Sequence, residues 1–286
     1  MYTSGFIKKH PVLAFYLVTF AISWGGILIV VGPGGFPSNP AQVQKMIPVM
    51  VVAMLGGPTL ATIFLTGLVD GKAGYRDLLS RLLTWRMGIG WYAAALFTAP
   101  LLWLAVGLAL AHIFPEFIPK IFTASNKGPF LGFGFAVGSV AGIFEELGWT
   151  GFVIPRLRLR LDALTTGIVV GFLWGAWHLL VNFVSSGTPA GTLSVPNLLG
   201  SVTFSLGILP AYRVLMVWVW DHTHSLLVAM LMHMSLTASS IILGPTATPG
   251  MMGAAWNPIM AAALWIVVAA RVVVSRERSP VRSVHG

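Results

Sequence analysis

Two adjacent carboxylates and two histidines lie inside apolar runs of this sequence, where ionisable side chains are rare. Glu145 and Glu146 lie near the end of one run, His178 lies in the next, and His233 lies in a later one. An acidic residue at the centre of a membrane helix costs roughly 2.5–3.5 kcal/mol on insertion scales, so such residues are usually kept for function. Carboxylates beside histidines are suited to general acid–base chemistry.

Helical periodicity indicates which of these side chains share a face. Successive helical residues differ by about 100°, so Glu145 and Glu146 cannot face one point in the same way. We expect one carboxylate at the reacting centre and the other to orient its partners. Residues four apart lie on one face. Three pairs of polar or aromatic residues have this spacing: Glu146 with Thr150, Trp174 with His178, and His233 with Thr237. A structural network that pins the helices together is the alternative interpretation.

Composition places these residues in a membrane. The chain has 286 residues, of which 56% are hydrophobic and 9% are charged, and its mean hydropathy is +0.85. Soluble domains carry about 25% charged residues. The sequence therefore predicts an all-α, polytopic membrane protein. It contains no cysteine, which excludes disulfides and thiol catalysis.

The apolar runs predict about eight transmembrane helices in a single domain covering residues 1–286. Each run is near or above the approximately 20 residues that a helix needs to cross a bilayer. The first follows Lys8 and Lys9, and we expect it to be retained as a span rather than cleaved as a signal peptide. The runs cover residues 11–31, 46–69, 89–114, 130–154, 164–184, 196–220, 224–243 and 254–274.

The basic residues predict an orientation in which both termini are cytoplasmic. They gather at alternate span ends, as the positive-inside rule requires for an even number of spans in the cell membrane. The net charge of +9 therefore indicates contact with the lipid bilayer, and we expect no nucleic-acid partner. The residues on the predicted inner side are Lys8, Lys9, Lys72, Arg76, Arg81, Arg86, Arg156, Arg158, Arg160, Arg271, Arg276, Arg278 and Arg282. The predicted outer side has Lys45, Lys120 and Lys127, and Arg213 lies within the sixth span.

Three strings in this part of the chain resemble the CPBP family (CAAX prenyl protease and bacteriocin-processing, also called Abi). They are E-E-L-G-W-T-G-F-V-I-P-R-L, then W-G-A-W-H, then D-H-T-H-S-L-L-V-A-M-L-M-H. The resemblance covers about residues 130–240 and implies a catalytic core at about 130–243. It also implies a hydrolase of the CAAX type, an intramembrane endopeptidase that cleaves a membrane-associated protein or peptide.

The resemblance also implies roles for single residues. Glu145 and His178 would activate the attacking water, and Glu146 would assist or orient. His233 would help to stabilise the tetrahedral oxyanion, where preorganised donors matter most. Trp174 would pack the site.

Two positions depart from the family pattern. The first motif usually ends in Arg where this chain has Thr150, and the third usually has Asn where it has Thr237. Thr150 removes a cation that could pair with Glu146, and Arg156 is close enough in sequence to be considered as its replacement. The departures keep open a non-proteolytic member that acts as a membrane immunity or partner-binding protein. A proton-coupled transporter ranks last, because no repeated halves are found.

The sequence leaves the metal question open. Glu145, His178 and His233 make a set of one Glu and two His, which is the composition of some catalytic zinc sites. Family members are often called metalloproteases. The same three residues would also suffice for water activation without a metal, as in a glutamate-dependent protease.

Overall fold

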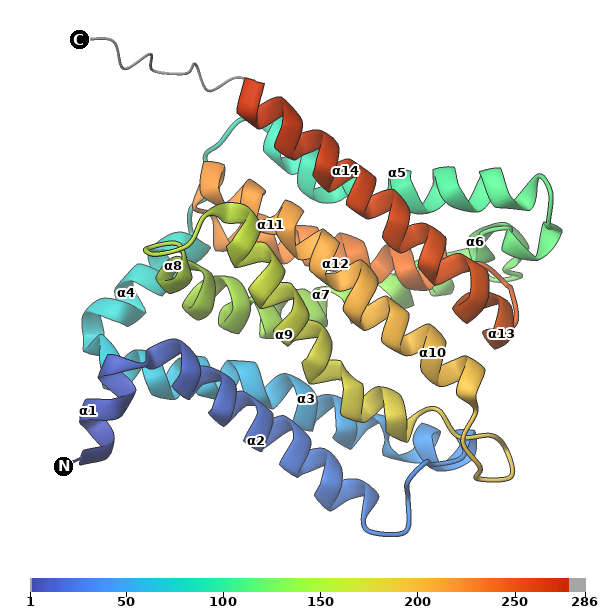
Figure 1. The fold of residues 1–286 in the computed structure, drawn as a ribbon, viewed down its shortest axis with the longest axis horizontal. Helices are drawn as coiled ribbons and strands as arrows, with labels where there is room; N and C mark the ends of the chain where they lie inside the picture. Colours follow the sequence, from blue (N-terminus) through green and yellow to red (C-terminus); the bar gives the residue numbers. More distant parts are fainter. Residues whose placement is uncertain (1, 278–286) are drawn as a thin grey trace.

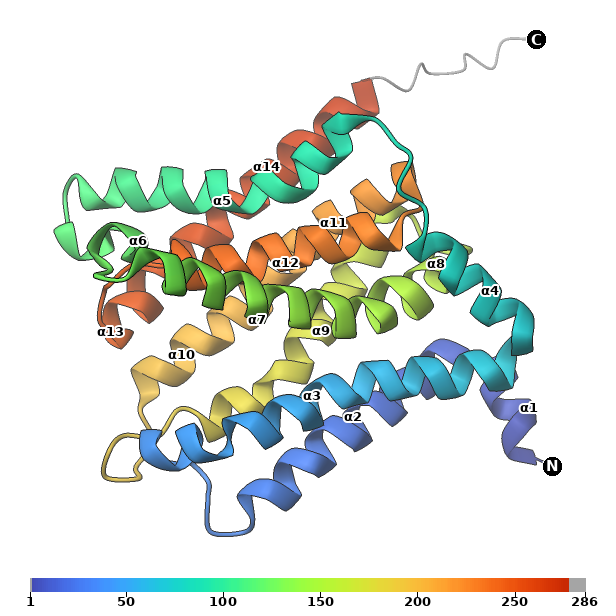
Figure 2. The ribbon, with the colours of Figure 1, turned by 180° about the vertical axis from the view of Figure 1, so that it is seen from behind.

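The computed structural model describes residues 2–277, and within them helices account for the regular structure, with no β-strand. This confirms the predicted all-α membrane bundle (Figure 1 and, from behind, Figure 2). The long helices are α2 (Pro11–Val31), α3 (Pro40–Val69), α5 (Ile89–Ala111), α7 (Lys127–Gly148), α9 (Ala163–Val184), α11 (Leu209–Thr223), α12 (Leu226–Ile242) and α14 (Asn257–Glu277).

Shorter elements connect or extend these helices. Two of them are π-helical turns that continue one helix into the next: η2 (Trp149–Val153) joins α7 to α8, and η3 (Phe204–Ile208) joins α10 to α11. The remaining short helices are α1 (Tyr2–Lys9), α4 (Gly71–Leu82), α6 (Lys120–Thr123), α8 (Ile154–Leu157), α10 (Val195–Thr203) and α13 (Pro249–Met251). A 3₁₀ turn, η1 (Pro115–Phe117), precedes α6, and a third π turn, η4 (Met252–Trp256), precedes α14.

Seven helical segments of the described chain are long and apolar enough to cross a membrane. The seventh predicted span, 224–243, is not among them: it corresponds to α12, which has only 17 residues. A helix of this length rises about 25 Å, slightly less than the hydrocarbon thickness of about 30 Å. Most of its side chains are buried against neighbouring helices. The short helix is therefore enclosed by the bundle that it helps to build.

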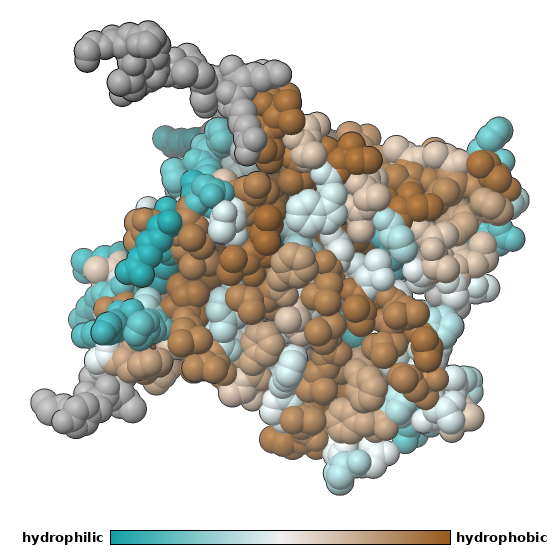
Figure 3. Space-filling view, in the orientation of Figure 1, coloured by the Kyte–Doolittle hydropathy of each residue, from teal (hydrophilic) through white to brown (hydrophobic). Residues whose placement is uncertain are grey.

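The two ends of the bundle differ in polarity. The helices α1, α4 and α8 and both ends of the described chain lie at one end (Figure 1), and hydrophilic residues gather there in Figure 3, beside a broad hydrophobic surface. Large apolar side chains such as Ile29, Val52 and Ile266 are exposed on the outside of the bundle, as contact with lipid requires. These features support an integral membrane protein. Arg278 and Arg282, used above for orientation, lie outside the described residues.

The second span begins earlier than predicted, at Pro40 rather than residue 46. Asn39 caps it: its side chain accepts a hydrogen bond of 3.0 Å from the Gln42 backbone N–H, and the Gln42 side chain accepts one of 2.9 Å from the Asn39 N–H. This reciprocal capping box satisfies two orphan donors, and proline is favoured at the first helical position. Local capping therefore extends the helix beyond its apolar run.

Glycines spaced four apart bring α7 against α12. A Cβ atom at Gly138 would lie 2.5 Å from the carbonyl oxygen of Met234, and one at Gly142 would lie 2.6 Å from that of Met230. Small residues at this spacing let two membrane helices approach closely. The next residue on the same stripe is Glu146. The packing of α7 therefore directs this carboxylate towards α12.

A second stripe brings α9 against α11 and the turn η3. A Cβ atom at Gly171 would lie 2.4 Å from the Cα of Pro210 and 3.1 Å from the Cβ of Arg213. One at Gly175 would lie 1.9 Å from the carbonyl oxygen of Ser205. Because no side chain larger than hydrogen fits there, α9 lies close enough to α11 for Arg213 to reach across it.

Candidate active site between α7, α9, α11 and α12

The helix that carries the two glutamates widens immediately after them. The backbone N–H of Trp149 points at the carbonyl oxygens of both Glu145 and Glu146, where α7 passes into the π turn η2. Such single π turns occur frequently at functional sites. The turn places Trp149, Thr150 and both glutamates in the bundle interior, where all four are buried.

Glu145 is held by two indole groups and keeps one oxygen free of donors. Its Oε2 accepts a hydrogen bond of 2.7 Å from Trp174 Nε1 and a longer one of 3.4 Å from Trp149 Nε1. Its Oε1 lies 4.0 Å from Nε2 of His233, and within residues 2–277 no hydrogen bond to Oε1 is found. Trp174 was predicted to pack the site, and it also orients this carboxylate.

Glu146 has the opposite environment, with donors around both of its oxygens. Arg213 forms a fork, with Nη1 2.7 Å from Oε2 and Nη2 2.8 Å from Oε1. Nδ1 of His233 lies 2.7 Å from Oε1, and the hydroxyl of Thr150 donates to Oε2. A carboxylate with these partners is suited to orienting groups rather than to accepting a proton.

Arg213 is the residue that the sequence analysis missed. It was counted only as a charge within the sixth apolar segment. In the structure it is fully buried, and its guanidinium carbon lies 4.2 Å from the centre of the Trp174 ring. A signal was present in the sequence. An arginine inside a span needs an anion, and the only carboxylates within predicted spans were Glu145 and Glu146.

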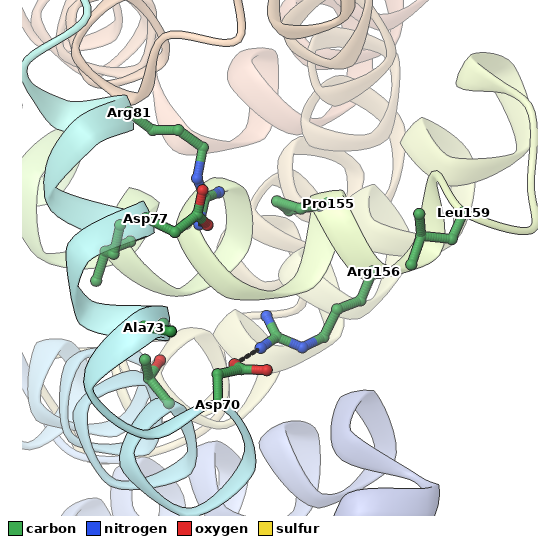
Figure 4. A pocket seen from close by; sticks show the side chains of 11 residues that line it. Asp70, Ala73, Asp77, Arg81, Pro155, Arg156 and Leu159 are labelled. Carbon is green, nitrogen blue, oxygen red and sulfur yellow. Dashed lines mark hydrogen bonds and ion pairs between the residues drawn. The ribbon is translucent and has the colours of Figure 1, made fainter.

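Arg156 does not replace the motif arginine, so that suggestion is wrong. Its guanidinium pairs with the carboxylate of Asp70, and its Nη1 donates a 2.7 Å hydrogen bond to the carbonyl oxygen of Phe152. Figure 4 shows the pair between α4 and α8. The recess that it lines has a volume of about 420 Å³, and neither Glu145 nor Glu146 is among its lining residues. Nearness in sequence misled here, because η2 carries Arg156 more than two turns beyond Glu146.

The Nδ1 atoms of both histidines form hydrogen bonds with oxygen acceptors. Nδ1 of His178 lies 2.9 Å from the carbonyl oxygen of Trp174, and Nδ1 of His233 faces the carboxylate of Glu146. Carbonyl and carboxylate oxygens accept, so each Nδ1 carries a proton. The neutral form of either ring therefore leaves Nε2 unprotonated and able to accept.

A largely apolar cavity of about 560 Å³ reaches Glu145 from the side of the bundle. Glu145, Trp177 and His178 are among its lining residues, and apolar side chains of α3, α7 and α9 form most of the rest. Figure 2 shows α3 and α7 diverging away from α4, and the lining residues of α3 belong to this diverging half. Glu145 and His178 thus share one cavity, although no hydrogen bond joins them in the described chain.

Among the predicted site residues, Thr237 makes the fewest polar contacts within the described part of the chain. It is half-buried, and no hydrogen bond of its side chain is found between residues 2 and 277. It lies one turn beyond His233 on α12, as its spacing predicted.

The arrangement does not fit a three-ligand zinc site. Among the residues described, no three His, Asp or Glu side chains come together as metal ligands. Ligand atoms about 2.0–2.1 Å from a tetrahedral zinc lie about 3.4 Å apart, whereas Glu145 and His233 are separated by 4.0 Å. The set of Glu145, His178 and His233 is therefore not gathered around one metal position.

The part of the chain that resembles known proteins contains the helices of the site, α7, α9, α11 and most of α12. Residues 127–239 match a family described as type II CAAX prenyl endopeptidase, Rce1-like. A curated relative, CAAX prenyl protease 2 of Methanococcus maripaludis, is 26% identical over 107 residues, which are 37% of this chain and 39% of the relative. The alignment thus spans well under half of either protein. Both glutamates, both histidines, Trp174 and Arg213 lie within the region that the family matches.

Proposed function

We propose that this chain, as a member of the Rce1-like family of CAAX prenyl endopeptidases, is an intramembrane endopeptidase. The match of residues 127–239 to that family supports the proposal. It hydrolyses a peptide bond in a membrane-associated protein or peptide. One observation carries the proposal: the donor-free oxygen of Glu145 faces His233, at a buried position that an apolar cavity reaches from the side of the bundle. The relative named CAAX prenyl protease 2 supports the same class of reaction.

The cavity supports a substrate that arrives within the bilayer. Apolar residues line most of it, among them Met50 and Met54 of α3, Val137 and Val140 of α7, and Val181 of α9. An apolar segment or a lipid chain attached to the substrate loses contact with lipid and gains contact with these side chains. The polar atoms of Glu145 and His178 then meet the peptide that the anchor carries.

Glu145 acts as the general base. The 4.0 Å between its Oε1 and Nε2 of His233 is a gap that one water spans, donating a hydrogen bond to each atom. As the water oxygen attacks the peptide carbonyl carbon, Glu145 takes one of its protons. When the carbon–nitrogen bond breaks, that proton passes to the leaving amine nitrogen, which leaves a carboxylic acid and an amine.

The other residues hold this arrangement. Glu146 fixes the ring of His233 through Nδ1, and Trp174 fixes Glu145. The donor role towards the oxyanion that the resemblance implies for His233 requires a second ring proton, at Nε2. His178 presents Nε2 as a second acceptor at the cavity. No step of the reaction is assigned to a metal.

Cleavage by the purified protein in liposomes tests the proposal. The substrates are fluorogenic peptides with a membrane-anchored end, with and without an isoprenoid-modified cysteine near the carboxyl terminus. Wild type is expected to cleave, and Glu145→Gln, which cannot take a proton, is expected to lose at least about 100-fold. Glu116→Gln is the matched control, because Glu116 is exposed in the turn η1.

Equal cleavage by folded wild type and Glu145→Gln would sink the endopeptidase assignment. A cellular effect that survives Glu145→Gln and His178→Ala would then favour the partner-binding alternative. The comparison of anchored with isoprenoid-modified peptides decides how far the resemblance to CAAX substrates extends to this chain.

A further inference from the structure

We infer that Arg213 is the positioning residue that takes the place of the arginine usual at the end of the family's first motif. Helix α11 supplies, from across the bundle, the cation that Thr150 does not supply from η2. The inference rests on the proposed function for its activity readout, and on geometry for the pairing itself.

The pairing has the form expected of a dedicated counterion. Two nitrogens of Arg213 meet two oxygens of Glu146 at 2.7 and 2.8 Å, and both side chains are fully excluded from the surface. Parallel, charge-assisted bonds of this kind fix orientation as well as charge. Within the described residues, no other carboxylate lies within ion-pair distance of Arg213. Its charge therefore serves Glu146.

Thr150 is complementary to this cation in size and in direction. Its hydroxyl donates to Oε2 of Glu146, the same oxygen that Nη1 of Arg213 contacts. A side chain at position 150 thus points at the carboxylate, as the motif arginine would by resemblance. Thr150 is buried, so a longer side chain there competes with Arg213 for the same volume. The small residue at position 150 and the arginine at position 213 thus form one exchange, in which the cation is supplied from position 213 instead of position 150.

Arg213 also connects the two glutamates. It binds Glu146, which holds His233, and it stacks over the ring of Trp174, which donates to Glu145. The stacking requires close approach of α9 to α11, which Gly171 permits. Loss of Arg213 therefore displaces both the carboxylate that orients and the carboxylate that reacts.

A relocation experiment tests the inference. Arg213→Met keeps an unbranched apolar stem but removes the guanidinium and its charge, and we expect kcat to fall about tenfold or more, the scale found when an outer partner of a reacting group is lost. KM is expected to change less, because Arg213 does not line the apolar cavity. Thr150→Arg/Arg213→Met returns a cation to Glu146 and is expected to recover most of the lost kcat.

Two further variants sharpen the comparison. Arg213→Lys keeps the charge but not the fork, so it is expected to fall between wild type and Arg213→Met. Arg156→Met removes an arginine that pairs with Asp70 outside the site and is expected to leave kcat unchanged. Full activity in Arg213→Met would overturn the inference. So would a folded Thr150→Arg/Arg213→Met protein that recovers nothing.

Thermal unfolding in detergent supplies a readout that needs no substrate. Arg213→Met and Glu146→Gln are each expected to lower the melting temperature, and the double variant to lower it by less than their sum. Adding Thr150→Arg to Arg213→Met is expected to restore the melting temperature. If Arg213→Met alone does not fold, the added Thr150→Arg is expected to restore the yield of folded protein. If wild type cleaves nothing, the proposed function fails, and this unfolding series still decides the exchange. Additive losses without recovery would refute it.

Discussion

The indole Nε1 of Trp174 on α9 lies 2.7 Å from Oε2 of Glu145 on α7. This bond occupies one oxygen of the carboxylate and leaves the other directed at His233, 4.0 Å away. The same indole ring receives Arg213 on its face and His233 at its edge. A tryptophan that the sequence suggested as packing is therefore the common neighbour of the acid, the histidine and the buried cation.

Trp174→Phe is expected to lower kcat about tenfold, because the ring and its stacking remain while the bond that orients Glu145 is lost. Steady-state cleavage kinetics measure the effect. Trp265→Phe is the matched control, since it also removes one indole hydrogen bond, of 3.1 Å to the Gly207 carbonyl oxygen, between α14 and η3, neither of which carries a site residue. Equal kinetics for the two variants would show that the bond to Glu145 has no catalytic role.

The glycine stripe of α7 gives a second prediction. Gly142→Ala places a Cβ atom 2.6 Å from the backbone oxygen of Met230, so α7 and α12 must separate. Glu146 lies one turn further along the same face, and His233 lies on the opposing helix. We expect the free energy of unfolding to fall by about 1–3 kcal/mol, as is typical of overpacking, and the melting temperature to fall with it. We also expect a lower kcat.

Gly132→Ala controls for helix propensity at the same time. It lies on the same helix, and a Cβ atom there meets nothing within 4 Å. Alanine favours a helix over glycine by about 0.8–1.0 kcal/mol, so this variant is expected to keep or raise the melting temperature. Similar behaviour of both variants would contradict a role for close packing at Gly142.

The pH dependence of stability has a defined contribution from the start of α9. Hydrogen bonds from the backbone N–H and hydroxyl of Thr165, each 2.8 Å, hold the pKa of Asp162 below its ordinary value of 3.8. A lowered pKa in the folded state means that the stabilisation is complete above pH 3.8 and is lost as the pH falls through the folded value. Asp162→Ala is expected to cost about 1 kcal/mol at neutral pH.

That cost is expected to shrink on acidification below pH 3.8, as measured by unfolding at a series of pH values. Ser194→Ala removes an uncharged cap, which accepts from the Asn197 backbone N–H at the start of α10. Its cost is expected not to vary with pH in the same range. Parallel pH profiles for the two variants would exclude the Asp162 carboxylate as the titrating cap.

Much of the fold followed from the sequence because a membrane helix is specified by the length of its apolar run. The ends of helices depended on capping instead, and Asn39 with Gln42 moved one start by several residues. Within a single helix, periodicity related Glu146 to Thr150. It carried no information about which helices meet, so it could not assign Arg213, 67 positions further along the chain, to Glu146. Proximity in sequence suggested Arg156, and the direction of α8 excluded it.

The apolar cavity yields the last prediction, which concerns substrate entry. Ala141 lines the cavity one turn before Glu145 on α7, so Ala141→Phe fills space next to the reacting carboxylate without changing a polar contact. We expect KM for an anchored peptide to rise several-fold, and kcat to change less. Ile143→Phe is the control, because Ile143 is exposed on another face of the same helix. If Ala141→Phe left KM unchanged and Ile143→Phe raised it, the substrate would have to approach along that other face of α7.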